Sequence, residues 1–198
     1  MSFITEARTS SESVVGYINI TAKKGGLFVG ETPLLTHLKS EDLIDKATFD
    51  ALKGKPFKVQ FESRYLAYGE YEWQGKTQRS VELRGTTEIG DKTYGVSFKV
   101  GFESVAAGYL LGGLLMVGNP FDRTLLVSAS GQQTKLGYTV TQVWVNLPEG
   151  EVPDGLSFNE IKNLDNSQRL NKLADLYPGK VFGLGETPEK PVLDDLPL

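Results

Sequence analysis

The sequence predicts a mainly β protein that folds as a small closed or partly closed barrel. Six or seven short segments alternate apolar and polar residues, and turn signals separate them at regular spacing. Glycines within these segments, such as Gly69, Gly85 and Gly95, suit the bending that a small barrel requires. We expect an OB-like barrel with extra hairpins, one or two helices and a flexible acidic C-terminal tail. A β-sandwich is the alternative.

Length and charge predict one domain with an appendage. The chain has 198 residues, and we expect residues 1–147 to form the barrel and residues 148–198 to form a helix followed by a partner-binding tail. Residues 148–198 carry five cations and ten carboxylates, so their net charge of −5 leaves +1 for residues 1–147. Nucleic-acid-binding proteins show this kind of charge asymmetry, as do other soluble proteins.

The first elements are a hairpin and a helix. Two strands over residues 13–31 are turned at Lys23, Lys24 and two glycines. Ser40 can cap a helix that ends at Gly54, with acidic residues in its first turn and apolar residues at helical spacing.

Two segments then have the period of two that is typical of half-buried strands. Residues 57–65 place Phe61, Ser63 and Tyr65 on one face, and residues 94–102 place Tyr94 on the face that also carries their valines and phenylalanines. The polar and glycine-containing turns between them predict successive hairpins.

The second half of the chain continues the sheet and ends in a helix. The apolar run at residues 105–118 is shorter than the roughly 20 residues that cross a bilayer, so we expect it to be buried in protein rather than in a membrane. Residues 123–146 predict one more hairpin, and residues 157–177 a helix. Residues after Gly179 are rich in glycine, proline and acid and predict a tether.

Composition argues against most catalytic chemistry. The chain has no cysteine and one histidine, His37, which leaves little for a metal centre and excludes thiol catalysis. No glycine-rich loop contains the lysine that a nucleotide-binding loop requires. Glu70 and Glu72 occupy alternate strand positions, a pattern more typical of a solvent-exposed strand face than of a catalytic pair of carboxylates. We therefore predict neither an enzyme nor a cofactor or metal.

A binding surface is the remaining interpretation. Between residues 53 and 99, nine cations and six carboxylates are interleaved with aromatic rings. Flat side chains stack on unpaired bases while Lys and Arg follow the phosphates. The candidate nucleic-acid-binding residues are Lys23, Lys24, Phe28, Lys58, Arg64, Tyr65, Tyr68, Tyr71, Trp73, Lys76, Arg79, Arg84, Tyr94 and Lys99. Aromatic residues also favour strands, so some of these rings could belong to the core.

The last residues add a partner-binding candidate: Asp194, Asp195, Leu196, Pro197 and Leu198. Their carboxylates can meet a basic rim while the leucines enter an apolar pocket. This ending resembles the C-terminal tip of bacterial and phage single-stranded DNA-binding proteins, in which an OB-fold body and a tether precede an acidic tip. The family normally ends in Phe where this chain ends in Leu198, and the tether here is short, which favours a phage or plasmid type.

The resemblance implies a protein that binds and protects single-stranded DNA during replication, recombination or repair. It also implies that the tail recruits replication or recombination proteins, without a membrane and with possible homo-oligomers, in the cytoplasm of a bacterial host cell. The alternative is a β-rich virion or assembly protein without nucleic-acid binding, whose subunit contacts would use residues 110–117 and 138–145.

Overall fold

The computed structural model describes residues 17–29, 58–89 and 91–183. The expected helix at residues 40–54, His37 and the tail with Asp194 to Leu198 lie outside the described residues.

Eight strands and three helices form the described part of the chain. They are β1 (Tyr17–Lys23), β2 (Gly26–Val29), β3 (Val59–Trp73), β4 (Lys76–Ile89), β5 (Lys92–Gly101), α2 (Val105–Val117), β6 (Arg123–Gln133), β7 (Thr139–Asn146), α3 (Phe158–Ile161), α4 (Asn166–Leu176) and β8 (Val181–Phe182). The predicted mainly β class is confirmed.

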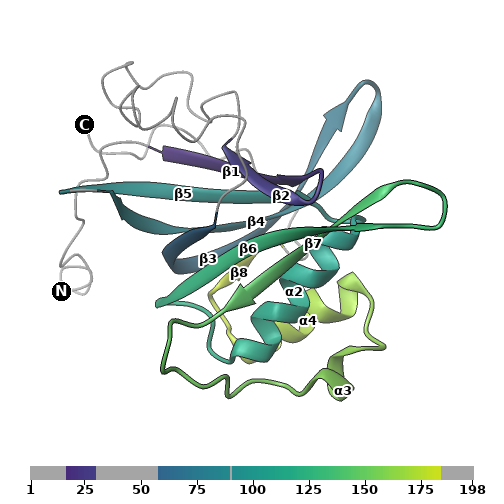
Figure 1. The fold of residues 1–198 in the computed structure, drawn as a ribbon. Coiled ribbons are helices and arrows are strands. Elements are labelled where there is room, and N and C mark those ends of the chain that lie inside the picture. The colour runs from purple at the N-terminus through teal and green to yellow at the C-terminus, as the bar shows by residue number, and fades with distance from the viewer. Residues whose placement is uncertain (1–16, 30–57, 90, 184–198) are drawn as a thin grey trace, which may run out of the picture.

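The strands make one sheet that curls into a nearly closed barrel, consistent with an OB-like fold (Figure 1). Its order is β2-β1-β5-β4-β3-β6-β7, with β8 paired beside β3. All neighbours run antiparallel except β1 with β5 and β3 with β8. The turn after β1 meets the β6–β7 hairpin, where the amide of Gly25 donates a hydrogen bond of 3.0 Å to Thr141 Oγ1.

A β-bulge in β3 changes which residues face the core. Ser63 pairs with Gly85 and Tyr65 with Arg84, so Arg64 is the extra residue. Upstream of it, Phe61 and Ser63 are buried, as the alternation predicts; downstream the buried residue is Leu66. The prediction that Tyr65 shares a face with Phe61 is therefore wrong, because one inserted residue reverses the phase of the strand.

Helix α2 occupies the open side of the curled sheet. It has no charged residue, and it buries Leu110, Leu111, Leu114 and Leu115 completely. Such a helix must be covered on every side. Ser104 caps its first turn by accepting a hydrogen bond from the amide of Ala107. The expectation that this run is buried in protein is confirmed.

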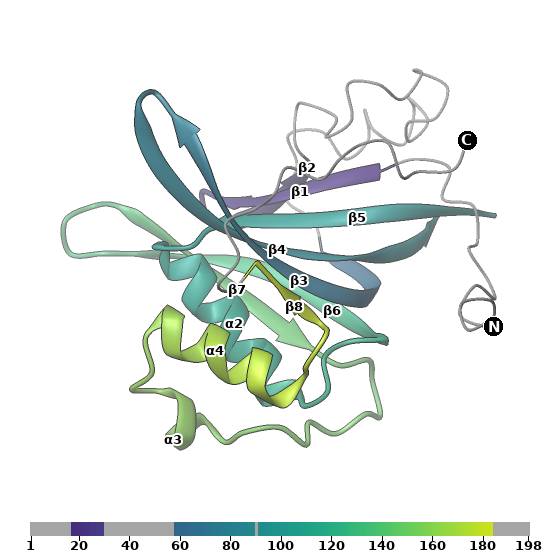
Figure 2. The same ribbon diagram turned by 180° about the vertical axis from the view of Figure 1, so that it is seen from behind.

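The C-terminal elements complete the cover (Figure 2). Leu170 and Leu173 of α4 join the core, and Arg169 donates a hydrogen bond of 2.8 Å to the carbonyl of Gly108 in α2. The strand β8 pairs with Leu66 and Ala67 of β3. The elements α4 and β8 therefore pack against α2 and β3.

The predicted helix at residues 157–177 is two helices. Asp165 accepts a hydrogen bond of 2.8 Å from the amide of Gln168 and thus starts α4 as a new N-cap, while Ser157 and Glu160 form a separate capping box for α3.

Gly85 provides a test of the close packing of β3 on β4. Its replacement by alanine should lower the free energy of unfolding by about 1–3 kcal/mol. The added carbon would lie 2.1 Å from the carbonyl oxygen of Glu62 and 2.7 Å from the Phe61 ring. Gly69→Ala on β3 is the matched control, because a Cβ added there would meet no atom within 4 Å outside Gly69 and its two chain neighbours. Urea unfolding measures both, and equal stability of the two variants would contradict the close packing.

Candidate nucleic-acid interface

The predicted site residues divide between the two faces of β3, β4 and β5. On the outer face, Tyr65 of β3 lies opposite Arg84 of β4, and Arg84 Nη1 donates a hydrogen bond of 3.1 Å to the Tyr65 hydroxyl. The Tyr65 ring packs edge-on against Phe182 of β8, at 5.4 Å between ring centroids. Tyr65 is therefore half-buried, and one side of its ring is already in contact with protein.

Glu82 neutralises Arg84 on the same face. Arg84 donates two hydrogen bonds to the Glu82 carboxylate, of 2.8 and 3.2 Å, and Ser97 donates a third of 2.5 Å. Burial alone would raise the pKa of Glu82, but these hydrogen bonds and the charges of Arg84 and Lys99 outweigh it and lower the pKa below its ordinary value. Arg84 is therefore held as part of a structural ion pair.

Tyr71 and Lys99 form the most accessible predicted pair. The Tyr71 side chain is 43% exposed, and the Lys99 ammonium lies 4.4 Å from the centre of its ring. They come from β3 and β5, with β4 between them. A ring with a cation over it offers a stacking surface beside a phosphate-binding charge.

Tyr68 and Arg79 lie on the opposite face. The Tyr68 ring packs edge-on against Phe102 at 5.1 Å, and its hydroxyl donates to Glu70. Arg79 lies 5.5 Å from the Phe102 ring centre and pairs with Glu103. These two residues hold the base of the β3–β4 hairpin to the body.

Tyr94 is not part of any surface. It is 1% exposed and belongs to the core, so the prediction that its ring is available for stacking is wrong. The physical reason is its strand face, which Tyr94 shares with Val96, Phe98 and Val100, all buried.

Most of the predicted arginine charge is neutralised within the protein. The bulge residue Arg64 pairs with Glu62 at 3.1 Å and lies 3.7 Å from Asp122. Arg79 and Arg84 have the carboxylate partners described above. Among the predicted cations whose side chains are described, those without an ion pair are Lys24, Lys58, Lys76 and Lys99. Free positive charge in this set is thus carried by lysines.

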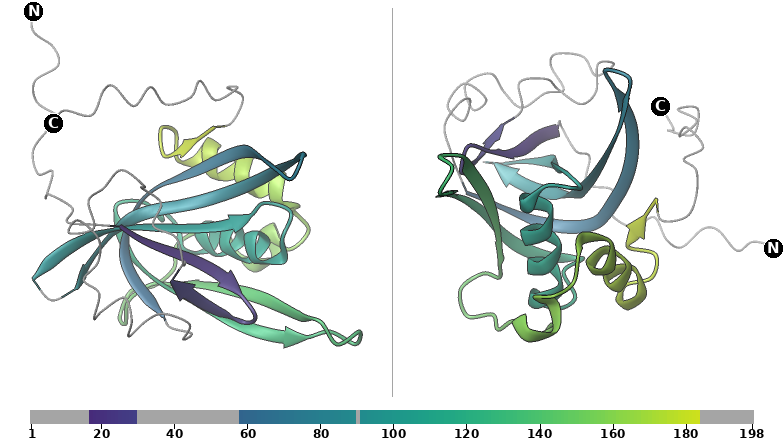
Figure 3. Two further views of the ribbon diagram at one scale, coloured as in Figure 1. Left: turned by 90° about the horizontal axis from the view of Figure 1, so that it is seen from above. Right: turned by 90° about the vertical axis from the view of Figure 1, so that its right-hand side faces the viewer.

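The hairpin turns bring unpaired lysines to one end of the barrel. The turns between β1 and β2, between β3 and β4, and between β6 and β7 all point in the same direction (Figures 1 and 3). They carry Lys24, Lys76 and Lys135, all exposed. The described side chains do not include Lys23, Phe28 and Trp73, whose backbones lie in β1, β2 and β3 beside these turns.

The β6–β7 turn is a candidate that the sequence patterns missed. Tyr138 is 71% exposed there, three residues after Lys135. The sequence interpretation stopped at Lys99, because only residues up to that point have a dense mixture of rings and cations. One lysine and one tyrosine on a distant hairpin carry too weak a signal without the topology.

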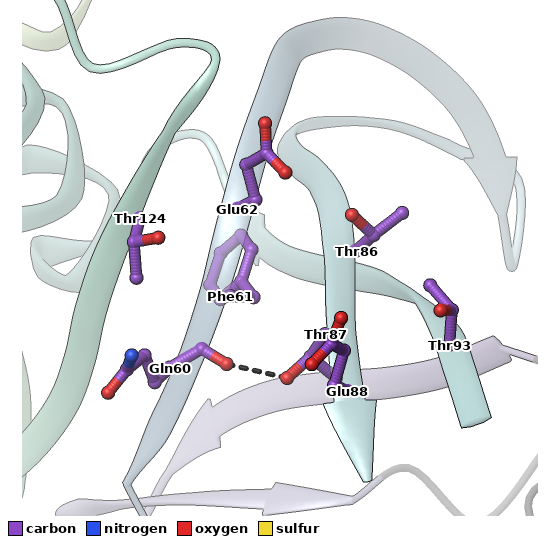
Figure 4. A pocket seen from close by; sticks show the side chains of 8 residues that line it. All are labelled: Gln60, Phe61, Glu62, Thr86, Thr87, Glu88, Thr93 and Thr124. Atoms are coloured by element: carbon purple, nitrogen blue, oxygen red, sulfur yellow. Dashed lines mark hydrogen bonds between the residues drawn. The ribbon is translucent and has the colours of Figure 1, made fainter. Parts of the chain in front are cut away.

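A polar pocket lies at the other end of β3 and β4 (Figure 4). Its volume is about 560 Å³, and its lining consists of Gln60, Phe61, Glu62, Thr86, Thr87, Glu88, Thr93 and Thr124. Thr87 Oγ1 donates a hydrogen bond of 2.7 Å to the Gln60 carbonyl across it. The described lining residues include two carboxylates and no cation, which disfavours a phosphate-bearing ligand.

The described side chains contain no group of three or more His, Asp or Glu that could hold a metal ion. None of the helices in the same part of the chain is both long and apolar enough to cross a membrane.

The lowered pKa of Glu82 predicts a pH-dependent contribution to stability. This contribution is complete above the ordinary carboxyl pKa of 4.5 and is lost as the pH falls through the lowered pKa, because protonation breaks the pair with Arg84. Urea unfolding between pH 7 and pH 3 should show a shallower loss of stability in Glu82→Gln than in the unsubstituted protein. At pH 7 the variant should be about 1–3 kcal/mol less stable, because Arg84 loses its partner. Glu88→Gln, an exposed residue of the same strand, is the control; identical pH profiles for Glu82→Gln and the unsubstituted protein would contradict the role of the pair.

Comparison with protein-family models, with curated proteins and with solved structures found no match for this chain.

Proposed function

We propose that this protein binds single-stranded DNA at the end of the barrel to which the hairpin turns project. The observation that carries the proposal is that Lys24, Lys76 and Lys135, all exposed, belong to three turns at this same end, where the β3–β4 and β6–β7 hairpins extend on either side of the β1–β2 turn (Figure 3). The exposed Tyr71 ring with Lys99 over it adds a place where a base can stack. Unpaired bases are accessible to such a ring only in a single strand.

The charges favour moderate, salt-sensitive binding. Four described lysines, Lys24, Lys76, Lys99 and Lys135, can reach phosphates without breaking an ion pair. Each phosphate contact with a single strand contributes about −0.7 to the slope of log affinity against log salt concentration, so we expect a slope of about −3. The ion-paired arginines add little, because a phosphate would have to displace a carboxylate.

The wider role extends this proposal. The protein would coat and protect single strands during replication, recombination or repair. Residues 194–198 would recruit partner proteins through two carboxylates and two leucines. Such a role belongs in the cytoplasm, including that of a bacterial host if a phage encodes the protein. It resembles the role of phage single-stranded DNA-binding proteins and requires no catalysis.

The virion or assembly alternative loses part of its basis. It needs residues 110–117 at a subunit contact, whereas Leu110, Leu111, Leu114, Leu115 and Val117 are inside the protein's own core. On β7, Val143 and Val145 are also buried. What remains for such a contact is the exposed part of the β6–β7 hairpin.

Removing charge from the hairpin turns tests the proposal. The double variant Lys24→Gln and Lys76→Gln should weaken binding to a fluorescein-labelled oligothymidine about tenfold in 0.1 M salt and make the salt slope about 1.4 shallower, because two phosphate contacts are lost. The matched control is Lys162→Gln with Lys172→Gln, two exposed lysines in the helical part of the chain, which should change neither quantity. Fluorescence anisotropy measures both. Binding that does not respond to salt, or a preference for duplex DNA, would contradict the proposed function.

Tyr71 tests the stacking part of the proposal separately. Tyr71→Ala should cost about 1–3 kcal/mol of binding free energy while leaving the salt slope unchanged, because a base contact is lost and no phosphate contact is. Phe158→Ala is the control, since Phe158 is an exposed ring on α3, 64% accessible. The same anisotropy titration applies, and equal affinities of the two variants would remove Tyr71 from the site.

A further inference from the structure

A second aromatic surface lies on the β6–β7 ribbon, outside the residues that the sequence singled out for nucleic-acid binding. Trp144 of β7 is 45% exposed, and its ring packs edge-on against Tyr109 of α2, at 5.4 Å between centroids. Its cross-strand neighbour is Ser128, while Ser130 pairs with Gln142. The surface has no charged side chain among Tyr109, Ser128, Ser130, Gln132, Gln142 and Trp144.

The Trp144 ring is held in place, and its only polar group already takes part in a hydrogen bond within the protein. The indole Nε1 donates a hydrogen bond of 2.8 Å to Ser130 Oγ, and Tyr109 supports the ring from the side. An indole has no other hydrogen-bonding atom. A ligand can therefore contact the exposed part of this ring only by apolar or stacking interaction.

Two glutamine amides lie next to the ring. Gln142 Nε2 donates to the Tyr109 hydroxyl at 2.7 Å and to Gln132 Oε1 at 2.8 Å, so both of its hydrogens are used. Among the described residues, Gln142 Oε1 and Gln132 Nε2 have no hydrogen-bond partner. One acceptor and one donor are thus available side by side on a fixed pair of amides.

We propose that Trp144, Gln142 and Gln132 form a nucleobase subsite of the proposed single-strand-binding surface; the inference rests on that proposed function. Residues i and i+2 of a strand stand about 7 Å apart, so a base stacked on Trp144 can present its hydrogen-bonding edge to Gln142. A base combines a flat ring with adjacent donors and acceptors on its edge, which matches this arrangement. The absence of a cation in the cluster disfavours a phosphate as the group held there.

The lysine nearest to the amides along the ribbon is Lys135, an exposed residue of the β6–β7 turn that lies three residues after Gln132. The turn that carries Lys24 packs on the other face of the ribbon, where the Gly25 amide donates to Thr141 Oγ1 and a Cβ on Gly25 would lie 2.6 Å from Gly131 Cα. A strand whose phosphates meet Lys135 therefore reaches the amides within about two nucleotides.

The two tryptophans of the chain, Trp73 and Trp144, make the inference directly testable. In full-length Trp73→Phe, the emission comes from Trp144 alone. Titration with oligothymidine should quench this emission along the same curve as the anisotropy of the labelled oligonucleotide. Trp144→Ala should weaken binding about 5- to 100-fold, whereas Phe158→Ala should change it less than twofold. Thermal unfolding checks that Trp144→Ala still folds, and the Trp73→Phe measurement does not depend on it.

The amides have a separate readout. Gln132→Ala with Gln142→Ala should bring the affinities for oligo-dT, oligo-dA and oligo-dC to within twofold of one another, whereas the unsubstituted protein should discriminate among them at least fivefold. The subsite is overturned, and the proposed function stands, if the protein binds normally but the Trp144 emission is not quenched and Trp144→Ala binds with unchanged affinity. Absence of any binding by the unsubstituted protein at low salt overturns both the subsite and the proposed function. An affinity loss in Trp144→Ala that only follows dissociation of an oligomer, measured by light scattering, would mark the surface as a subunit contact and overturn the subsite.

Discussion

The fold depends on the need to cover an uncharged helix. Helix α2 has apolar or small residues on every side, and at about 25 cal/mol per Å² of apolar surface its exposure would be costly. The curled sheet covers one side, while α4 packs against another, where Arg169 donates a hydrogen bond to the Gly108 carbonyl. This requirement explains why the C-terminal elements pack on the barrel, and why Gly108 and Gly113 lie where Arg169 and Val145 come closest to the helix.

Neutralisation of charge decides what the sheet surface can do. The segment that forms β3, β4 and β5 looks cationic in sequence, yet Arg64, Arg79 and Arg84 all have carboxylate partners in the folded chain. An ion pair holds its guanidinium in a fixed geometry and lowers the local potential. Among the predicted cations with described side chains, the positive charge without an ion pair therefore lies on lysines, two of them at the hairpin turns.

The long β3–β4 hairpin and the β6–β7 hairpin extend beyond the barrel on either side of the β1–β2 turn (Figure 3). Their turns carry polar residues, lysines and exposed rings rather than core residues. Hydrogen bonds such as that of Gly25 to Thr141 fix the central turn to one of these ribbons. At this end of the barrel the β1–β2 turn is thus fixed to the β6–β7 hairpin, and the two longer hairpins project beyond it. The pocket with Glu62 and Glu88 lies at the opposite end of β3 and β4.

The sequence by itself determined the strand class, the hairpin turns at Lys24 and Gln74, the burial of residues 105–118 and the absence of thiol chemistry, because these follow from local periodicity, turn chemistry and composition. It could not place Tyr65, because one bulge at Arg64 reverses the strand phase, and a bulge depends on the partner strand. The alternation of residues 94–102 placed Tyr94 on the same strand face as valines and phenylalanines that are buried. Tyr94 was nevertheless a binding candidate, because the sequence around it mixes aromatic rings with cations. Only the tertiary structure paired Arg79 with Glu103, set Lys99 over Tyr71 and packed the turn that carries Lys24 against one face of the β6–β7 ribbon. Those contacts join residues from separate strands and helices, and their geometry arises only when the sheet curls around α2.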